Sequence, residues 1–165
     1  MTGFIIRGGS VPCPLDSLIL KGIAIMNAEL QRFEMLLVED EETEAYLVKW
    51  ALGINEIEVE LHHVLNGYEA LQYLRRAGIH RYPDLILLDL NMPRMNGLEC
   101  LAEIKQDAAL CEIPVVVLTT SYARSDMDAS KKLGAVDFIT KPMDMYQLAE
   151  AVRVMGTRWI SPQST

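Results

Sequence analysis

Carboxylate residues follow two apolar runs that have the composition of buried β-strands. Glu39 and Asp40 come at the end of a run that begins at Met35, and Asp89 follows Leu85–Leu88. Ligands of parallel sheets bind at the carboxyl ends of the strands. If these strands are neighbours, the carboxylates share one cleft, and a like-charge pair ~4 Å apart costs about 4 kcal/mol at an effective dielectric of ~20. Because oxygen ligands without histidine or thiolate select Mg²⁺ or Mn²⁺, the pattern predicts a Mg²⁺ site.

Two further polar side chains come at the ends of later strands. Thr119 closes a β-branched run 30 residues after Asp89, and Lys141 closes the last predicted strand another 22 residues on. A hydroxyl, an ammonium and a cation site around one carboxylate suit a phosphoryl group bound to that carboxylate. Asp89 is therefore the expected nucleophile, which would form an aspartyl phosphate.

Simpler interpretations exist for each of these acidic residues. An aspartate after a strand often caps a helix or occupies a turn, and the residues after Asp89 are rich in turn formers. Glu39 and Asp40, if they stood alone, would be expected merely to face solvent at the end of their strand. The chemical interpretation depends on all the strand ends meeting at one edge of the sheet.

Strand and helix patterns alternate from residue 35 onward. The predicted strands are Met35–Glu39, Ile57–Val64, Leu85–Leu88, Pro114–Leu118 and Ala135–Ile139, and the predicted helices are Thr43–Leu52, Tyr68–Ala77, Leu98–Ala108, Arg124–Leu133 and Asp144–Arg158. In the first helix the apolar spacing rests on Tyr46, Leu47, Trp50 and Ala51, and Gly53 is expected to end it. This alternation predicts an α/β fold, a doubly wound five-stranded parallel sheet in the order 2-1-3-4-5 with five helices.

Composition excludes several classes of protein. Half of the 165 residues are hydrophobic, which argues against a disordered chain, and the net charge of -8 argues against a direct nucleic-acid partner. No run approaches the ~20 apolar residues of a membrane span. The three cysteines follow no metal or disulfide pattern, which favours a reduced, cytoplasmic protein.

The ordered set of site residues resembles a known family. Glu39-Asp40, Asp89-Leu90-Asn91-Met92-Pro93, Gly97, Thr119 and Lys141-Pro142 at these spacings are similar to the receiver domain of bacterial response regulators, with its CheY-like, flavodoxin-like fold. The resemblance covers residues 35 to about 158. The sequences of residues 64–76, 84–94 and 114–121 are similar to those of the small single-domain regulators paired with cyanobacterial phytochromes.

The resemblance implies a phosphoacceptor and a metal site. Asp89 would accept a phosphoryl group from a phosphohistidine. The donor would be a histidine kinase, for example one of phytochrome type, or a phosphotransfer protein. Asp40 and Asp89 would ligate Mg²⁺ together with the main-chain carbonyl of Asn91, and Glu39 would hold the metal largely through water. Glu39 stands where aspartate is also found in the family, and it keeps the carboxylate.

The resemblance also implies how the signal is handled. Thr119 and Lys141 would contact the phosphoryl oxygens, and Thr119 would pair with Phe138 in a conformational switch. An ordinary core aromatic is the alternative for Phe138. Asn91 and Ser121 stand where the family tunes hydrolysis of its phosphoaspartate.

We expect three parts along the chain. Residues 1–33 would form an N-terminal extension, either poorly ordered, amphipathic, or the product of an upstream start before Met26; residues 34–158 would form the receiver and 159–165 a tail. With one helix after the last strand, output would pass through protein contacts on the face of the fourth helix, fifth strand and fifth helix. Trp159 and Ile160 would contribute to a homodimer there, or cap the core.

The expected role is that of a signalling phosphoacceptor, limited to phosphorylation and dephosphorylation of itself, and not of an enzyme. The alternative is a small Mg²⁺-dependent phosphatase with an aspartyl nucleophile. Such enzymes usually place a second aspartate two residues after the nucleophile, where this chain has Asn91. A flavin-binding domain of similar topology is disfavoured because the carboxylates after the first strand would repel the flavin phosphate.

Overall fold

The structure is a computed structural model that describes residues 32–77 and 81–160. The chain divides into two units, Met1–Arg32 and Phe33–Thr165, and the helices and strands described here belong to the second. Its strands are β1 (Glu34–Val38), β2 (Glu60–Val64), β3 (Leu85–Leu88), β4 (Val115–Thr119) and β5 (Asp137–Thr140). Its helices are α2 (Glu42–Ile54), α3 (Gly67–Ala77), α4 (Gly97–Gln106), α5 (Arg124–Leu133) and α6 (Met145–Trp159). The predicted extension and tail lie outside the described residues, apart from their inner ends.

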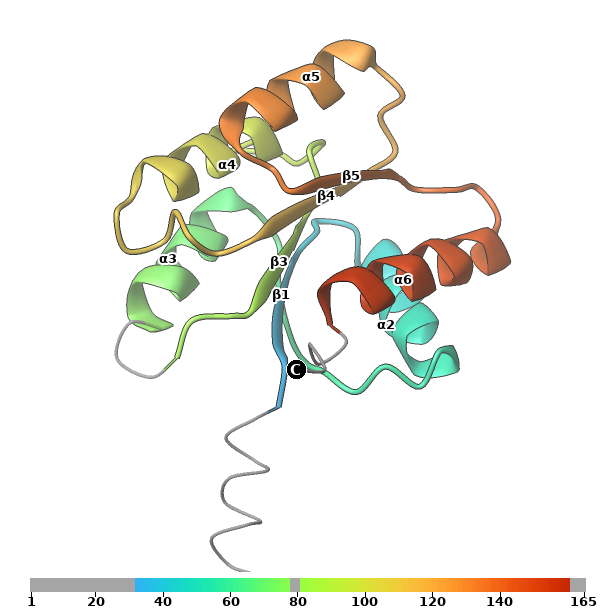
Figure 1. The fold of residues 1–165 in the computed structure, drawn as a ribbon. Helices are drawn as coiled ribbons and strands as arrows, with labels where there is room; N and C mark the ends of the chain where they lie inside the picture. The colour runs from blue at the N-terminus through green and yellow to red at the C-terminus, as the bar shows by residue number, and fades with distance from the viewer. Residues whose placement is uncertain (1–31, 78–80, 161–165) are drawn as a thin grey trace, which may run out of the picture. The chain divides into compact units, whose positions relative to one another are not determined.

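The five strands form one parallel sheet in the order β2-β1-β3-β4-β5, which confirms the predicted fold. Helices α2 and α6 cover one face and contact each other, while α3, α4 and α5 cover the opposite face (Figure 1). This arrangement buries the central strands on both sides, as their apolar composition requires.

Two apolar clusters, one on each face, hold these layers together. Along β1 the alternation of side chains places Met35 and Leu37 in the cluster under α2 and α6, and Leu36 and Val38 in the cluster under α3 and α4. All four residues of β3 are fully buried. The last residues of β1 and β3 are therefore held rigidly, and the polar residues that follow them inherit that rigidity.

Helix α2 differs from its prediction at Tyr46. The buried positions are Ala45, Val48, Ala51 and Leu52, whereas Tyr46 is 65% exposed. Of the other predicted apolar positions, Ala51 is buried, and Leu47 and Trp50 are partly buried against the same cluster. The small side chains of Ala45 and Ala51 suit the packing of α2 against α6.

Some predicted boundaries moved by a few residues. Strand β2 begins at Glu60 although the alternation of apolar residues starts at Ile57, since the residues before Glu60 do not pair with β1. Helix α2 continues one residue beyond Gly53. Helix α4 ends at Gln106, before the predicted Ala108, because Asp107 leaves helical geometry.

Candidate functional site

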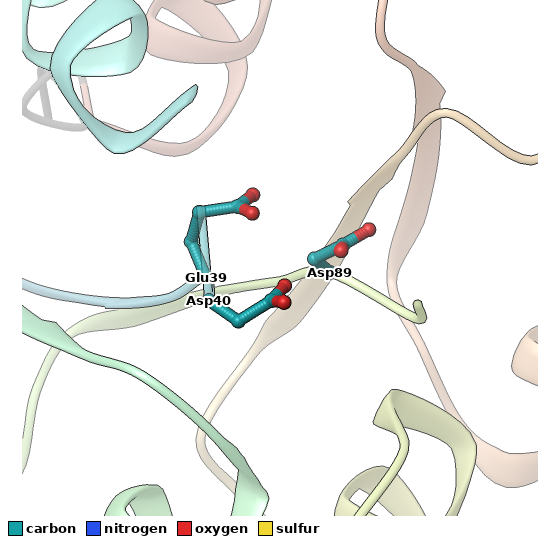
Figure 2. A group of neighbouring side chains, drawn as sticks. All are labelled: Glu39, Asp40 and Asp89. Carbon is teal, nitrogen blue, oxygen red and sulfur yellow. The ribbon is translucent and has the colours of Figure 1, made fainter. Parts of the chain in front are cut away.

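Neighbouring strands bring the three predicted carboxylates together. Val38 of β1 is in register with Leu88 of β3, so the residues that follow them start from the same edge. The main-chain N–H of Asp89 donates to the carbonyl of Val38 at 3.0 Å, which continues the ladder by one residue. One oxygen from each of Glu39, Asp40 and Asp89 lies within 4.8 Å of the others (Figure 2).

Two of these carboxylates are buried, and two have an oxygen that accepts no hydrogen bond. Glu39 is 1% exposed and Asp89 is 5% exposed. Burial raises the pKa of Glu39, the contact with Lys141 partly offsets this, and the charge of Asp89 raises it further. One buried oxygen of Asp40 and one of Asp89 accept no hydrogen bond. A set of hard oxygen ligands with unused lone pairs fits a divalent cation such as Mg²⁺.

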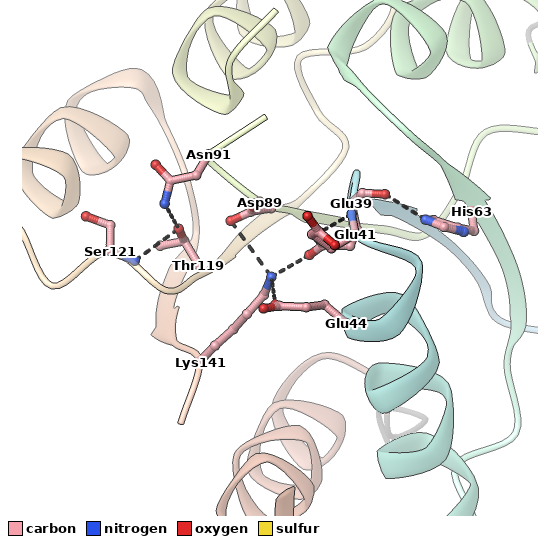
Figure 3. A network of polar contacts seen from close by, with 9 residues as sticks. All are labelled: Glu39, Glu41, Glu44, His63, Asp89, Asn91, Thr119, Ser121 and Lys141. Atoms are coloured by element: carbon pink, nitrogen blue, oxygen red, sulfur yellow. Dashed lines mark hydrogen bonds and ion pairs between the residues drawn. The ribbon is translucent and has the colours of Figure 1, made fainter. Parts of the chain in front are cut away.

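Lys141 is buried beside this cluster as its counter-charge. Its ammonium forms ion pairs with Glu39, with Glu44 at 2.6 Å and with Asp89 at 3.9 Å (Figure 3). Burial by itself lowers the pKa of Lys141, but the carboxylates of Asp89, Glu39 and Glu44 outweigh it and raise that pKa above its ordinary value. The ammonium therefore stays charged, and its hydrogen bonds go to the two glutamates and not to Asp89.

Thr119 is fully buried at the end of β4 with its hydroxyl oxygen fixed by two donors. The side-chain amide of Asn91 and the main-chain N–H of Ser121 each approach that oxygen at 3.3 Å. Because the oxygen accepts both bonds, the hydroxyl proton remains available for a new acceptor. The side chain of Ser121 in turn donates to Asp126 at the start of α5.

A tight turn after β3 holds Asp89 in place. The N–H of Gly97 donates to the carbonyl of Leu90 at 3.0 Å, and a Cβ on Gly97 would lie 2.2 Å from the carbonyl oxygen of Asp89. Asn96 and Glu99 form a reciprocal capping box that starts α4 at this point. Only glycine permits this approach of the helix to the backbone of Asp89.

The structure brings most of the predicted site residues together at the carboxyl end of the sheet. Glu39, Asp40, Asp89, Thr119 and Lys141 lie at one edge of the sheet, and Asn91 and Ser121 contact Thr119. Phe138 is partly buried and pairs with Val117, two residues before Thr119 along β4.

Two contacts of the site were not predicted. Glu44 binds Lys141, and the imidazole Nε2 of His63 lies 2.8 Å from the main-chain oxygen of Glu39 (Figure 3). The position of Glu44 in the first turn of a helix after β1 was a signal, because that turn starts at the same edge. Acidic residues are common there for their interaction with the helix dipole, so its type did not single it out.

Comparison with known proteins identifies the family of this chain. Residues 35–153 match the family model of the response regulator receiver domain. The chain belongs to the response regulator receiver family. The response regulator Rcp1 of Synechocystis sp. is 40% identical over 129 residues, which are 76% of this chain and 88% of Rcp1.

Solved receivers share the fold at similar identity. The crystal structure of phosphorylated RcpA, a cyanobacterial phytochrome response regulator, has a TM-score of 0.74 at 40% identity and covers 79% of this chain and 95% of that one. The Mn²⁺-bound form of Rcp1 has a TM-score of 0.72 at 37% identity and covers 79% and 96%. Membership in this receiver family places the chain in two-component signalling, and these matches lend no support to the phosphatase alternative.

Proposed function

We propose that Asp89 accepts a phosphoryl group from a histidine kinase and that the phosphorylated receiver signals through protein contacts. The observation that carries this proposal is the position of the Asp89 carboxylate. It is buried, has an oxygen without a hydrogen bond, and lies between the carboxylates of Glu39 and Asp40 and the ammonium of Lys141.

The transfer itself requires one bond to form and one to break. A carboxylate oxygen of Asp89 attacks the phosphorus of a phosphohistidine, the O–P bond forms, and the P–N bond breaks with its electron pair left on the imidazole. Lys141 and Thr119 would then bind phosphoryl oxygens, Lys141 by charge and Thr119 through its free hydroxyl proton. For this, the Lys141 ammonium has to turn from the glutamates toward Asp89.

The acidic residues would hold the metal that this transfer needs. Asp40 and Asp89 offer buried oxygens without hydrogen-bond partners, and the main-chain carbonyl of Asn91 would complete the set, with Glu39 bound through water. When bound, Mg²⁺ neutralises charge on the phosphoryl oxygens. The Mn²⁺-bound form of Rcp1 supports a divalent cation in this family.

We propose that Thr119 and Phe138 form the conformational switch and that Asn91 and Ser121 set the lifetime of the phosphoaspartate. If Thr119 moves toward the phosphoryl group, it leaves its bonds with Asn91 and Ser121, and Phe138 would follow into the space behind it. Phe138 already lines a cavity of about 400 Å³ between β5 and α6. Asn91 and Ser121, which border the carboxylate edge, would tune hydrolysis of the phosphoaspartate.

The relatives support a proposal for the partners. Rcp1 and RcpA support a histidine kinase of phytochrome type as the phosphodonor, with a phosphotransfer protein as the alternative. The face of α5, β5 and α6 would carry the output, with homodimerisation as one form of it. Trp159 donates from its indole to Asp137 at 3.4 Å and Ile160 packs against the core, which supports their role as a core cap more than as a dimer contact.

We expect a cytoplasmic location, where kinases and their receivers exchange phosphate. Among the described helices, none has both the length and the apolar character to cross a bilayer. The catalytic activity expected of the protein is limited to its own phosphorylation and dephosphorylation.

Acetyl phosphate with Mg²⁺ tests the phosphorylation site. We expect the wild-type protein to gain one phosphoryl group by intact-mass spectrometry and Asp89→Asn to gain none. Asp128→Asn is the matched control, because Asp128 is exposed on α5 and its change alters the net charge equally. Labelling of Asp89→Asn would refute the site, and steady release of alcohol from simple phosphate monoesters would favour a phosphatase.

Sedimentation velocity tests the dimer. The wild-type protein is compared with and without beryllium fluoride, which stands in for the phosphoryl group on Asp89. A shift toward a dimer on addition of the mimic is expected, and a monomer under both conditions would exclude phosphorylation-dependent dimerisation.

A further inference from the structure

Glu44 contacts the phosphorylation site without belonging to the set of residues that the family resemblance identifies. Its carboxylate accepts a hydrogen bond from the Lys141 ammonium at 2.6 Å, while the same ammonium lies 3.9 Å from Asp89. Figure 3 draws Glu44 and Asp89 on different sides of the ammonium, with Glu44 projecting from α2. Lys141 is thus held between helix and sheet.

Phosphorylation changes what Lys141 has to bind. An ammonium has three N–H donors, and in the present state two of them go to Glu39 and Glu44. The third donor can reach a phosphoryl group on Asp89 only if the ammonium, which lies 3.9 Å from the nearest Asp89 oxygen, moves toward it. Each contact with a glutamate restrains that movement and therefore competes with the contact that the reaction needs.

The two glutamates differ in how readily they can release the lysine. The side chain of Glu39 is 2% exposed, so it would lose its counter-charge without gaining water, whereas the side chain of Glu44 is 35% exposed. A cavity of about 160 Å³ beside Glu44 and Lys141, lined also by Pro142 and Met143, leaves room for either side chain to turn. Glu44 is the partner that can be exchanged for the phosphoryl group.

We propose that Glu44 is a positioning residue that holds the Lys141 ammonium back from Asp89 in the unphosphorylated protein and thereby slows formation of the phosphoaspartate. The proposal rests on the proposed function, since it concerns the same reaction. Its effect is on the rate at which the site becomes phosphorylated, through competition for one lysine.

The test compares phosphorylation rates with acetyl phosphate at saturating Mg²⁺. Loss of one partly exposed ion pair predicts that Glu44→Gln is phosphorylated about fivefold faster than wild type. Glu42→Gln is the matched control, since Glu42 is exposed in the same helical turn and outside the Lys141 network, and its rate is expected within about twofold of wild type. Glu44→Asp, which keeps the charge, is expected to restore a rate nearer to wild type.

A second comparison separates competition from a structural effect. In a Lys141→Gln background the ammonium is absent, so adding Glu44→Gln is expected to change the residual rate by less than about twofold. An unchanged or slower rate for Glu44→Gln would overturn the proposal, as would an equal acceleration in the Lys141→Gln background. Failure of the wild-type protein to become labelled at Asp89 would instead refute the proposed function.

Discussion

Residues of the same chemical type have different tasks at this site because their surroundings differ. Glu39 and Asp40 are adjacent, yet Glu39 binds Lys141 and the N–H of Glu41, while Asp40 keeps a buried oxygen without a hydrogen bond. The longer side chain of Glu39 reaches across to the lysine. Asp40, like Asp89, is thereby left with a carboxylate oxygen that can bind a metal.

Cys100 allows a test of burial at the scale of one residue. It lies fully buried on α4, and burial followed by the charge of Glu103 raises the pKa of its thiol to about 12, from an ordinary 9.0. Above about pH 9 the unfolded chain loses this proton while the folded protein keeps it, so the free energy of unfolding falls as the pH rises toward about 12.

The expected loss is about 1 to 2 kcal/mol between about pH 8 and about pH 10.5 for wild type relative to Cys100→Ala, measured by urea denaturation. Lysines and tyrosines titrate in both proteins, so their contributions to the free energy of unfolding cancel in the difference. A difference that does not change with pH would contradict the raised pKa of Cys100.

At the scale of elements, the start of α4 places the nucleophile. The backbone of Gly97 lies so close to Asp89 that a Cβ would approach its carbonyl oxygen to 2.2 Å and the Cα of Leu90 to 2.6 Å. Backbone atoms cannot give way as a flexible side chain can. Gly97→Ala therefore has to displace either α4 or the turn that carries Asp89.

We expect Gly97→Ala to lower the free energy of unfolding by about 3 kcal/mol and to slow phosphorylation of Asp89. Gly53→Ala is the paired control in α2, where a Cβ would meet nothing within 4 Å. It is expected to stabilise by up to about 1 kcal/mol, because alanine favours the helix more than glycine does. Chemical denaturation measures both, and equal effects of the two substitutions would contradict the close approach at Gly97.

At the scale of the whole molecule, the stability of the fold is coupled to the charge at one edge of its sheet. Folding collects Glu39, Asp40 and Asp89 within 4.8 Å of one another, and the extended chain holds them apart. Their repulsion opposes folding, and a divalent cation that binds the folded state alone relieves it.

Mg²⁺ is therefore expected to raise the thermal unfolding midpoint of wild type, by the equivalent of about 2.7 kcal/mol at ~100 times its dissociation constant. Asp40→Asn should be more stable than wild type in EDTA and should lose most of the response to Mg²⁺. Asp128→Asn should keep the wild-type response. Scanning calorimetry distinguishes these outcomes, and a full Mg²⁺ response in Asp40→Asn would exclude Asp40 as a ligand.

Sequence patterns predicted the strands and their order well, because the apolar runs and their alternation with helices fit few folds. The short continuous apolar run Leu85–Leu88 predicted a central strand, and it is buried on both faces. In α2 the period of the helix was clear but its orientation was not, because Tyr46 has an apolar ring that tolerates exposure at 65%. Trp50 is partly buried against Tyr146 of α6, with ring centroids 6.1 Å apart, and that contact depends on how two helices pack.

The sequence by itself determined which chemical groups follow the strands, and therefore that Asp89 lies among carboxylates, a hydroxyl and an ammonium. Parallel strands end at one edge, so residue type and order along the chain suffice for that conclusion. Only the tertiary structure decided how the ammonium is shared. Lys141 binds Glu39 and Glu44 and lies 3.9 Å from Asp89 because the packing of α2 sets where Glu44 is placed, and a distance between two elements is not encoded in either one alone.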